Sequence, residues 1–109
     1  MLIASWNVNS IRTRFYQVKD FLENNKIDIL CLQETKVSNN NFPVKAFEDI
    51  GYSVKFSGQK SYNGVAIISK FEFQDCKVDF IGELNENQVA KEYLIQKRII
   101  SASINDIRI

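Results

Sequence analysis

Hydrophobic residues in the first third of the chain change from the spacing of a strand to that of a helix and back. Residues 2–6 (LIASW) predict a short strand, and residues 11–25 carry apolar side chains at the spacing of an amphipathic helix. Ser10 or Asn9 can cap the start of this helix. Residues 27–33 (IDILCLQ) form a nearly continuous apolar run, which is typical of a strand buried on both faces. The order strand, helix, strand predicts a βαβ unit with parallel strands.

The second half of the chain is richer in strand patterns, which turn-forming residues separate. A short helix is expected between Pro43, which suits the first helical position, and Gly51, which suits the position after a helix. Asn63 and Gly64 form a turn signal, and residues 85–95 are polar and then mildly helical. Strands are expected at 52–56, 65–69, 73–80, 100–104 and 107–109. We therefore expect an α/β fold with mixed sheets.

Composition narrows the class of protein. The chain has 109 residues, of which 45% are hydrophobic and 25% charged, so it can bury a core. This balance excludes a disordered tail, a collagen-like fibre and a disulfide-rich miniprotein. The net charge of +1 excludes a strongly basic protein that coats nucleic acid, but it leaves room for a local basic patch. Because the sequence has no histidine, a mechanism that needs imidazole cannot operate on this chain alone.

The two cysteines, Cys31 and Cys76, are far apart and do not have the spacing of a metal site. Cys31 lies in an apolar run and is expected to be a small core residue. No stretch reaches the roughly 18 consecutive apolar residues of a membrane span, and the first residues lack the basic start of a signal peptide. We therefore expect a protein with no membrane partner in a reduced, cytoplasmic setting.

Polar side chains follow the first two predicted strands at the point where each strand ends. Asn7 comes directly after LIASW, and Glu34 follows the second strand. Because the ends of parallel strands share one crevice, these two side chains are expected to face each other, and their oxygens suit Mg²⁺ or Mn²⁺. The start of the helix with Arg12, together with Lys36, suits a phosphate. Further phosphate or sugar contacts can come from Lys60 and Tyr62.

Each of these residues also has a structural interpretation. Asn7 and Asn9 are typical cap and turn residues, because their side chains bond nearby backbone. A glutamate after a strand, such as Glu34, is commonly solvated or ion-paired, and Arg12 fits the solvated face of a helix. Trp6, within the first strand, fits a core position better than a stacking platform. The residue pattern by itself leaves both interpretations open.

Three segments resemble exonuclease III-type apurinic/apyrimidinic endonucleases, which belong to the endonuclease/exonuclease/phosphatase superfamily. The segments are SWNVNSIR (5–12), DILCLQETK (28–36) and GQKSYNGVAIISK (58–70), with FPVKAFEDIGY (42–52) between the second and third. They occur in the order and spacing of the family. The likeness covers essentially the whole chain and is weaker between 72 and 95. Residues 1–109 are therefore expected to be the N-terminal part of a single family domain.

The resemblance implies part of a four-layer α/β sandwich, with two mixed sheets face to face and helices outside. It also implies hydrolysis of DNA phosphodiesters with Mg²⁺ or Mn²⁺, on double-stranded DNA with abasic sites or 3′ ends. Glu34 matches the family's metal-ligand glutamate, and Asn7 matches the active-site asparagine beside the metal, so both are expected in catalysis and metal binding. Asn9 matches a commonly acidic or asparagine position in the same cluster. DNA contacts are expected from Asn9, Arg12, Lys36, Tyr62 and Asn63.

The later motifs of the family are absent from this sequence: its catalytic tyrosine, its Gly-Asp-x-Asn segment and its C-terminal Ser-Asp-His. We therefore expect a truncated domain that is inactive or nearly so on its own. The apolar inner faces of strands 27–33 and 65–69 are expected to be partly bare, with an unpaired edge at 107–109. Bare apolar faces and free edges promote association.

Two other interpretations stay open. The chain can belong to another phosphodiesterase or phosphatase of the superfamily, because the C-terminal loops that define the substrate are missing, although GQKSYNGVA favours the repair branch. Alternatively, it can be a non-catalytic subunit or interaction module that needs a separate, complementing C-terminal half.

Overall fold

The computed structural model describes residues 1–78 and 96–109, so the expectation for residues 85–95 lies outside the described residues. Its helices are α1 (Ile11–Asn25) and α2 (Val44–Glu48), with a short 3₁₀ helix at Asn39–Asn41. Its strands are β1 (Ile3–Asn7), β2 (Ile29–Gln33), β3 (Ser53–Ser57), β4 (Val65–Ser69), β5 (Asp75–Lys77), β6 (Ser101–Ile104) and β7 (Ile107–Arg108). None of the described helices is both long and apolar enough to cross a membrane.

The larger sheet, sheet A, has the strand order β1-β2-β4-β3. Strands β1 and β2 are parallel, with Ile3 opposite Ile29 and Asn7 opposite Gln33. Strand β4 runs antiparallel to both of its neighbours. The predicted βαβ unit and the mixed sheet are both confirmed.

Helix α1 connects β1 to β2 and has the boundaries that its apolar spacing predicts. Ser10 is the N-cap, because its hydroxyl accepts a hydrogen bond from the backbone N–H of Thr13 at 3.2 Å. Lys26 ends the helix in a left-handed conformation (φ 50°), and its N–H bonds the Leu22 carbonyl. The shorter helix α2 begins one residue after Pro43, one position later than expected.

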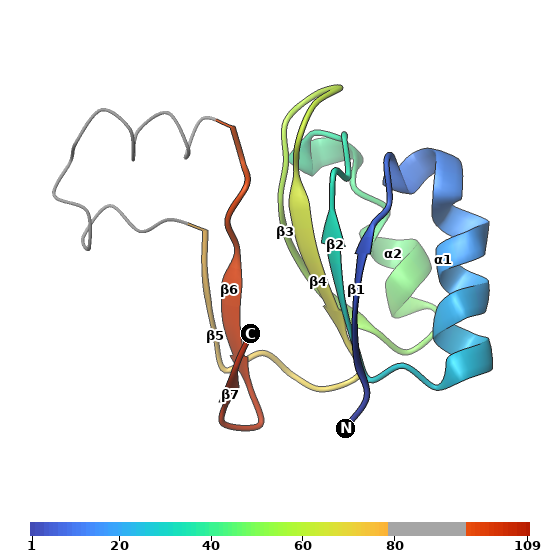
Figure 1. Cartoon of the computed structure of the whole chain (residues 1–109), viewed down its shortest axis with the longest axis vertical. Coiled ribbons are helices and arrows are strands. Elements are labelled where there is room, and N and C mark those ends of the chain that lie inside the picture. The colour runs from blue at the N-terminus through green and yellow to red at the C-terminus, as the bar shows by residue number, and fades with distance from the viewer. Residues whose placement is uncertain (79–95) are drawn as a thin grey trace, which may run out of the picture.

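Sheet B has the strand order β5-β6-β7 and is antiparallel throughout its described residues. Figure 1 shows α1 and α2 on one face of sheet A and sheet B on the other. The described residues therefore form a layer of helices, sheet A and sheet B, which is the mixed α/β architecture expected from the sequence. Across sheet B, Arg108 pairs with Asp75 at 2.5 Å.

Two clusters of buried side chains hold these layers together. The larger cluster lies between the helices and sheet A and includes Phe47, Leu30 and Ile68. The smaller cluster lies between the two sheets and joins Ile29 and Ile67 of sheet A to Ala102 and Ile104 of β6.

The expected bare face on strand 65–69 is not found, because every residue of β4 is buried. Strand β6 and the half-buried Phe71 and Phe73 cover this side of the sheet. In β2, the expectation holds only for the half-buried Cys31 and Gln33, since Ile29, Leu30 and Leu32 are buried. Among the described residues, large apolar side chains are exposed at the start of the chain, at Met1, Leu2 and Ile3, and also at Tyr16, Tyr62, Val78 and Ile107.

Candidate functional site

The ends of β1 and β2 and the start of α1 are tied together by backbone hydrogen bonds. The N–H groups of Val8 and Ser10 donate to the carbonyls of Gln33 and Glu34, both at 2.9 Å. The N–H of Ile11, the first residue of α1, donates to the Thr35 carbonyl at 3.0 Å. The segment after β1 therefore runs beside the segment after β2, which fixes the polar side chains of both in one place.

A third segment, the end of the β3–β4 loop, joins this arrangement from the other side. The N–H of Lys36 donates to the Asn63 carbonyl at 2.8 Å, and that of Thr35 donates to the Gly64 carbonyl at 3.3 Å. Gly64 has φ 95° and is buried against Thr35. The segment after β2 is thus held between the other two by the main chain, independently of surface side chains.

The side chains of Asn7 and Glu34 are in direct contact, as their strand positions predict. The Asn7 amide donates to the Glu34 carboxylate, and the Asn7 carbonyl oxygen accepts from the N–H of Asn9 at 3.2 Å. Lys36 Nζ lies 2.5 Å from the Asn9 side-chain oxygen and 3.8 Å from Glu34 Oε1. We refer to Asn7, Asn9, Glu34 and Lys36 as the polar cluster.

The polar cluster lies on strained backbone. Asn9, Glu34 and Lys36 all have φ between 44° and 59°, in the left-handed region that non-glycine residues seldom adopt. The backbone bonds to α1 and to the β3–β4 loop hold these conformations in place. Such strain is concentrated at functional sites, where it orients side chains before a ligand binds.

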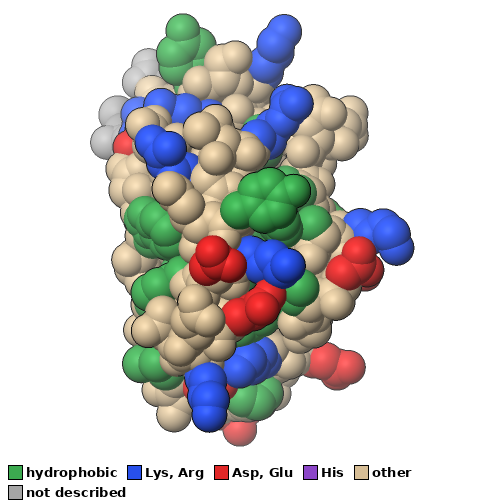
Figure 2. Space-filling model, turned by 90° about the vertical axis from the view of Figure 1, so that its right-hand side faces the viewer, with side chains coloured by type: hydrophobic (Ala, Val, Ile, Leu, Met, Phe, Trp, Pro, Cys, Tyr) green, Lys and Arg blue, Asp and Glu red, His purple; other side chains and the backbone are tan. Residues whose placement is uncertain are grey.

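Basic side chains line the rim of the polar cluster next to α1. A shallow hollow of about 450 Å³ lies between the first turn of the helix and the segment after β2. Its lining residues are Ser10, Arg12, Thr13, Lys36 and Val37. Figure 2 shows basic side chains over the whole height of the helix-covered face, including its upper end, while its acidic side chains lie mainly lower down. This combination of cations and a helix N-terminus can hold a phosphate.

The remaining residues expected at the site lie in the loop between β3 and β4. The side-chain amide of Asn63 donates a hydrogen bond to the side-chain oxygen of Gln59. The backbone carbonyl of Asn63 accepts from the N–H of Lys36, so Asn63 is part of the backbone framework that holds the site. Tyr62 is 68% exposed and Lys60 is exposed, so both are accessible to a ligand from the same loop. The structure therefore brings together Asn7, Asn9, Glu34, Lys36 and Asn63, with Arg12 and Tyr62 beside them.

The donor set fits a hard divalent cation only in part. Glu34 supplies a carboxylate with a side chain 44% exposed, and the Asn7 oxygen already accepts a hydrogen bond from Asn9. No cluster of three His, Cys, Asp or Glu side chains occurs in residues 1–78 and 96–109. Because Mg²⁺ keeps several waters and takes as few as one carboxylate from a protein, Glu34 is a suitable ligand within a larger set.

The two cysteines are poor candidates for a nucleophile. Cys31 is half-buried in β2, and burial raises the pKa of its thiol. Burial is also the main factor that raises the pKa of Cys76. Both thiols therefore stay protonated near neutral pH. Cys31 packs against the smaller buried cluster but is only half-buried, so the expectation of a core residue holds in part.

Sequence reasoning missed the contribution of residues 97 and 98. The N–H of Gly64 donates to the Lys97 carbonyl at 3.1 Å, which brings this segment to the β3–β4 loop. Arg98 lines a small hollow of about 120 Å³ together with Glu34 and Asn63. The sequence signal for this position is the basic pair Lys97 and Arg98, just ahead of the strand predicted at 100–104. It adds two cations to the surroundings of Glu34.

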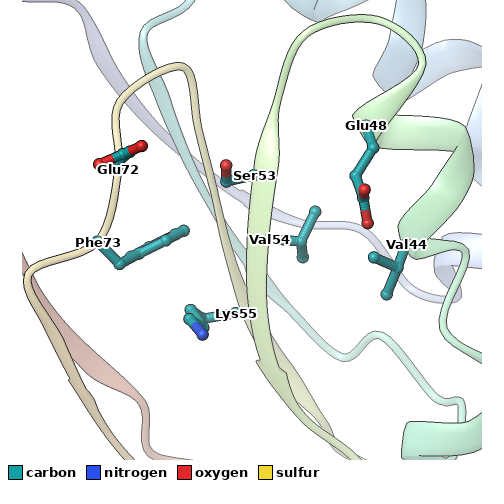
Figure 3. A pocket seen from close by; sticks show the side chains of 7 residues that line it. All are labelled: Val44, Glu48, Ser53, Val54, Lys55, Glu72 and Phe73. Atoms are coloured by element: carbon teal, nitrogen blue, oxygen red, sulfur yellow. The ribbon is translucent and has the colours of Figure 1, made fainter.

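Another hollow, of about 370 Å³, lies away from the polar cluster, between α2, β3 and the segment after β4 (Figure 3). It includes Glu48, Lys55 and Glu72, and none of the residues expected at the site lies in it. Strand β3 is at the opposite edge of sheet A from β1. We therefore do not assign this hollow to the candidate site.

Gly64→Ala is expected to disturb the framework of the site much more than Gly51→Ala. Both glycines have φ above 90°, so a side chain costs roughly 1–2 kcal/mol of backbone strain at either position. A Cβ at Gly64 would also lie 2.1 Å from Thr35 Oγ1, whereas a Cβ at Gly51 meets nothing within 4 Å. Urea unfolding should show the larger loss of stability for Gly64→Ala, with amide shift changes at Thr35 and Lys36. Equal losses for the two variants would contradict this close packing.

Comparison with known proteins shows a family match, similar sequences and similar structures. The chain matches the Endonuclease/Exonuclease/phosphatase family over residues 4–97. It is 38% identical over 104 residues to exodeoxyribonuclease III of Haemophilus influenzae, covering 95% of this chain and 36% of that protein. It is similar in structure to an AP endonuclease from Archaeoglobus fulgidus, with 45% identity, a TM-score of 0.84, and coverage of 99% of this chain and 39% of that one.

A further similar structure is a variant of the 3′ phosphatase NExo from Neisseria, bound to a product DNA hairpin. It has 39% identity and a TM-score of 0.84, and the match covers 97% of this chain and 38% of that one. The chain therefore spans between about a third and two fifths of the length of these relatives. The expectation that it makes up only part of such a fold is confirmed.

Proposed function

Because this chain belongs to the endonuclease/exonuclease/phosphatase family, we propose that its polar cluster is part of a divalent-metal-dependent site that hydrolyses DNA phosphodiesters. The contact between Asn7 and Glu34 at the ends of two parallel strands carries this proposal. It puts a carboxylate and a carboxamide at the crevice where α/β sheets bind ligands. The basic rim beside it supplies the charge that a phosphate needs.

Each member of the polar cluster has a distinct part in this proposal. Glu34 holds Mg²⁺ or Mn²⁺ through its carboxylate, and Asn7 orients that carboxylate through its amide hydrogen bond. Lys36, whose ammonium bonds Asn9 and faces Glu34, stays within reach of an incoming phosphate. When bound, the metal supplies positive charge against the phosphoryl oxygens, where negative charge builds up during hydrolysis.

The proposed substrate is double-stranded DNA with abasic sites or 3′ ends. Relatives with this fold include an exodeoxyribonuclease III and an AP endonuclease, and a DNA hairpin is bound in another similar structure. Arg12 and the N-terminus of α1 would contact the backbone, with Lys36 and Asn9 nearer the scissile phosphate. The exposed Tyr62 and the neighbouring Asn63 would contact the minor groove.

DNA binding by the chain tests this proposal. With a net charge of +1, the chain is expected to bind an abasic-site duplex weakly and with a strong dependence on salt. Arg12→Ala and Lys36→Ala should each weaken binding and reduce the slope of log affinity against log salt by about 1. Fluorescence anisotropy of a labelled duplex across a salt series measures both quantities.

Lys45→Ala provides the matched control for this experiment. Lys45 is 90% exposed on α2, where it pairs with Asp49 at 3.7 Å, so its removal changes the net charge equally. It should leave both affinity and salt slope nearly unchanged. If the three variants weaken binding to the same extent, DNA contacts the chain through overall charge, and the proposed interface is wrong.

A further inference from the structure

We propose that the free edge of β3, with the hollow beside it, binds an extended segment of a partner protein that carries an arginine or lysine next to an apolar residue. We call this surface the β3 groove. It is the hollow of about 370 Å³ shown in Figure 3, lined by Val44 and Glu48 of α2, residues 53–55 of β3, and Glu72 and Phe73. The inference does not depend on the proposed catalysis, because β3 lies at the opposite edge of sheet A from β1.

The hydrogen bonds of β4 determine which main-chain groups of β3 are free. The N–H of Lys70, the residue after β4, donates to the Asp28 carbonyl at 2.9 Å, in register with the pairs between β2 and β4. The peptide groups along an antiparallel strand point alternately to its two neighbours. Ile68 and Ala66 therefore bond β2, as Lys70 does, and Ile67 bonds β3.

Val54 and Phe56 direct their main-chain groups away from the sheet. The partner of Ile67 in β3 is Lys55, so Lys55 turns its N–H and C=O toward β4. The residues on either side of it, Val54 and Phe56, turn theirs outward. No strand pairs with this side of β3 among residues 1–78 and 96–109, where β3 ends the order of sheet A. An added strand can therefore form a β-ladder with β3.

The β3 groove surrounds this edge with side chains on both faces of the sheet. Val54 packs with the larger buried cluster and lies on the same side of β3 as Val44 and Glu48 (Figure 3). Lys55 lies on the other side, with Phe73, whose ring points toward β3. Val44, Val54 and Phe73 are half-buried, so apolar surface flanks the outward peptide groups. An edge strand in such a groove offers a peptide both backbone and side-chain contacts.

The charges of the β3 groove identify the occupant. Glu48 and Glu72 are exposed, and neither takes part in an ion pair within the described parts of the chain. Glu48 is the charged residue of the lining on the side of Val44 and Val54. An arginine or lysine paired with Val54 can lay its aliphatic stem along these valines and carry its cation to Glu48. The next residue would point to the other side, where Phe73 favours an apolar side chain.

Lys55 disfavours a second copy of the chain as the occupant. If β3 paired with β3 of another copy about Lys55, the two lysines would lie directly opposite each other, which is destabilising. A cation bound at Glu48 does not meet Lys55, because β3 separates the two side chains (Figure 3). The carboxylates Glu48 and Glu72 likewise disfavour the phosphates of nucleic acid. A partner protein with a basic segment is therefore the occupant that we infer.

Titration of the full 109-residue chain with a capped hexapeptide, Ser-Thr-Arg-Leu-Thr-Ser, tests this inference. We expect binding with a Kd of about 0.1–1 mM. At a peptide concentration about ten times the Kd, hydrogen exchange at the Val54 and Phe56 amides should slow about tenfold. The amide signals of Asn7 and Glu34 should not shift, and Mg²⁺ should have no effect on binding. The result is thereby separate from that of the proposed metal site.

Two pairs of modified peptides separate charge from backbone pairing. Replacing the arginine of the peptide by glutamate should weaken binding at least about tenfold, whereas lysine should keep most of the affinity. N-methylation of the arginine amide should also weaken binding at least about tenfold, because this N–H pairs with Val54. N-methylation of the leucine amide should not, because that N–H faces away from β3.

Matched variants of the chain locate the surface. Glu48→Gln removes the carboxylate that meets the arginine, and Glu23→Gln removes an exposed carboxylate of α1 that is not part of the β3 groove. Glu48→Gln should weaken binding of the arginine peptide about threefold, and Glu23→Gln should not.

The inference is wrong if about 5 mM peptide leaves the Val54 and Phe56 amides unaffected. It is also wrong if the glutamate peptide binds as well as the arginine peptide, or if Glu48→Gln and Glu23→Gln have equal effects. Self-association of the chain that protects the Val54 and Phe56 amides would identify a second copy as the occupant and would likewise overturn it.

Discussion

Glu34→Gln is expected to weaken the binding of Mn²⁺ at the polar cluster at least about tenfold. The carboxylate is the anionic ligand that the cluster offers, and a neutral amide cannot replace its charge. Glutamine can still accept the hydrogen bond from Asn7 through its side-chain oxygen, so the local fold should be retained. Paramagnetic broadening of the Asn7 and Glu34 amide signals during a Mn²⁺ titration measures the effect.

Glu48→Gln is the control for this variant. Glu48 is an exposed carboxylate at the hollow between α2 and β3, so its replacement removes the same charge away from the polar cluster. This variant should keep the broadening at Asn7 unchanged. If broadening at Asn7 persists in Glu34→Gln at the same Mn²⁺ concentration, the metal is held by other groups and the assignment of Glu34 is refuted.

The strength of each sequence pattern explains how well the elements could be predicted. Helix α1 has its expected boundaries because a regular apolar spacing and a capping serine coincide at Ser10. The parallel pairing of β1 and β2 follows from the intervening helix, and it brings Asn7 to Glu34. The contact between Asn7 and Glu34 could therefore be predicted from the strand order and from the polar residues at the strand ends.

Features that depend on the packing of distant segments could not be predicted in the same way. An apolar run shows that β4 is buried, but not that β6 covers it, so its inner face was wrongly expected to be partly bare. The approach of Lys97 to the β3–β4 loop depends on a backbone hydrogen bond to Gly64, and backbone bonds leave no trace in side-chain pattern. Likewise, the contact of Gly64 with Thr35 involves no charged or motif residue.

The 109-residue chain is expected to give no detectable incision of a labelled abasic-site duplex in Mg²⁺. Within the described residues, the polar cluster offers one carboxylate and no group of three His, Cys, Asp or Glu side chains that could complete a metal site. The sequence also has no histidine to act as a general base. A positioned base contributes about 10²–10⁴-fold to rate, and each lost oxyanion donor costs about 10²–10³-fold. We therefore expect a rate at least about 10⁴-fold below that of the A. fulgidus relative under the same conditions.

An EDTA control and the Glu34→Gln variant show whether any cleavage comes from this chain or from a contaminating nuclease. Cleavage that survives Glu34→Gln comes from a contaminant, since such an enzyme does not depend on this residue. Cleavage that disappears both with EDTA and with Glu34→Gln would show that the polar cluster is sufficient, and the expected inactivity would be wrong.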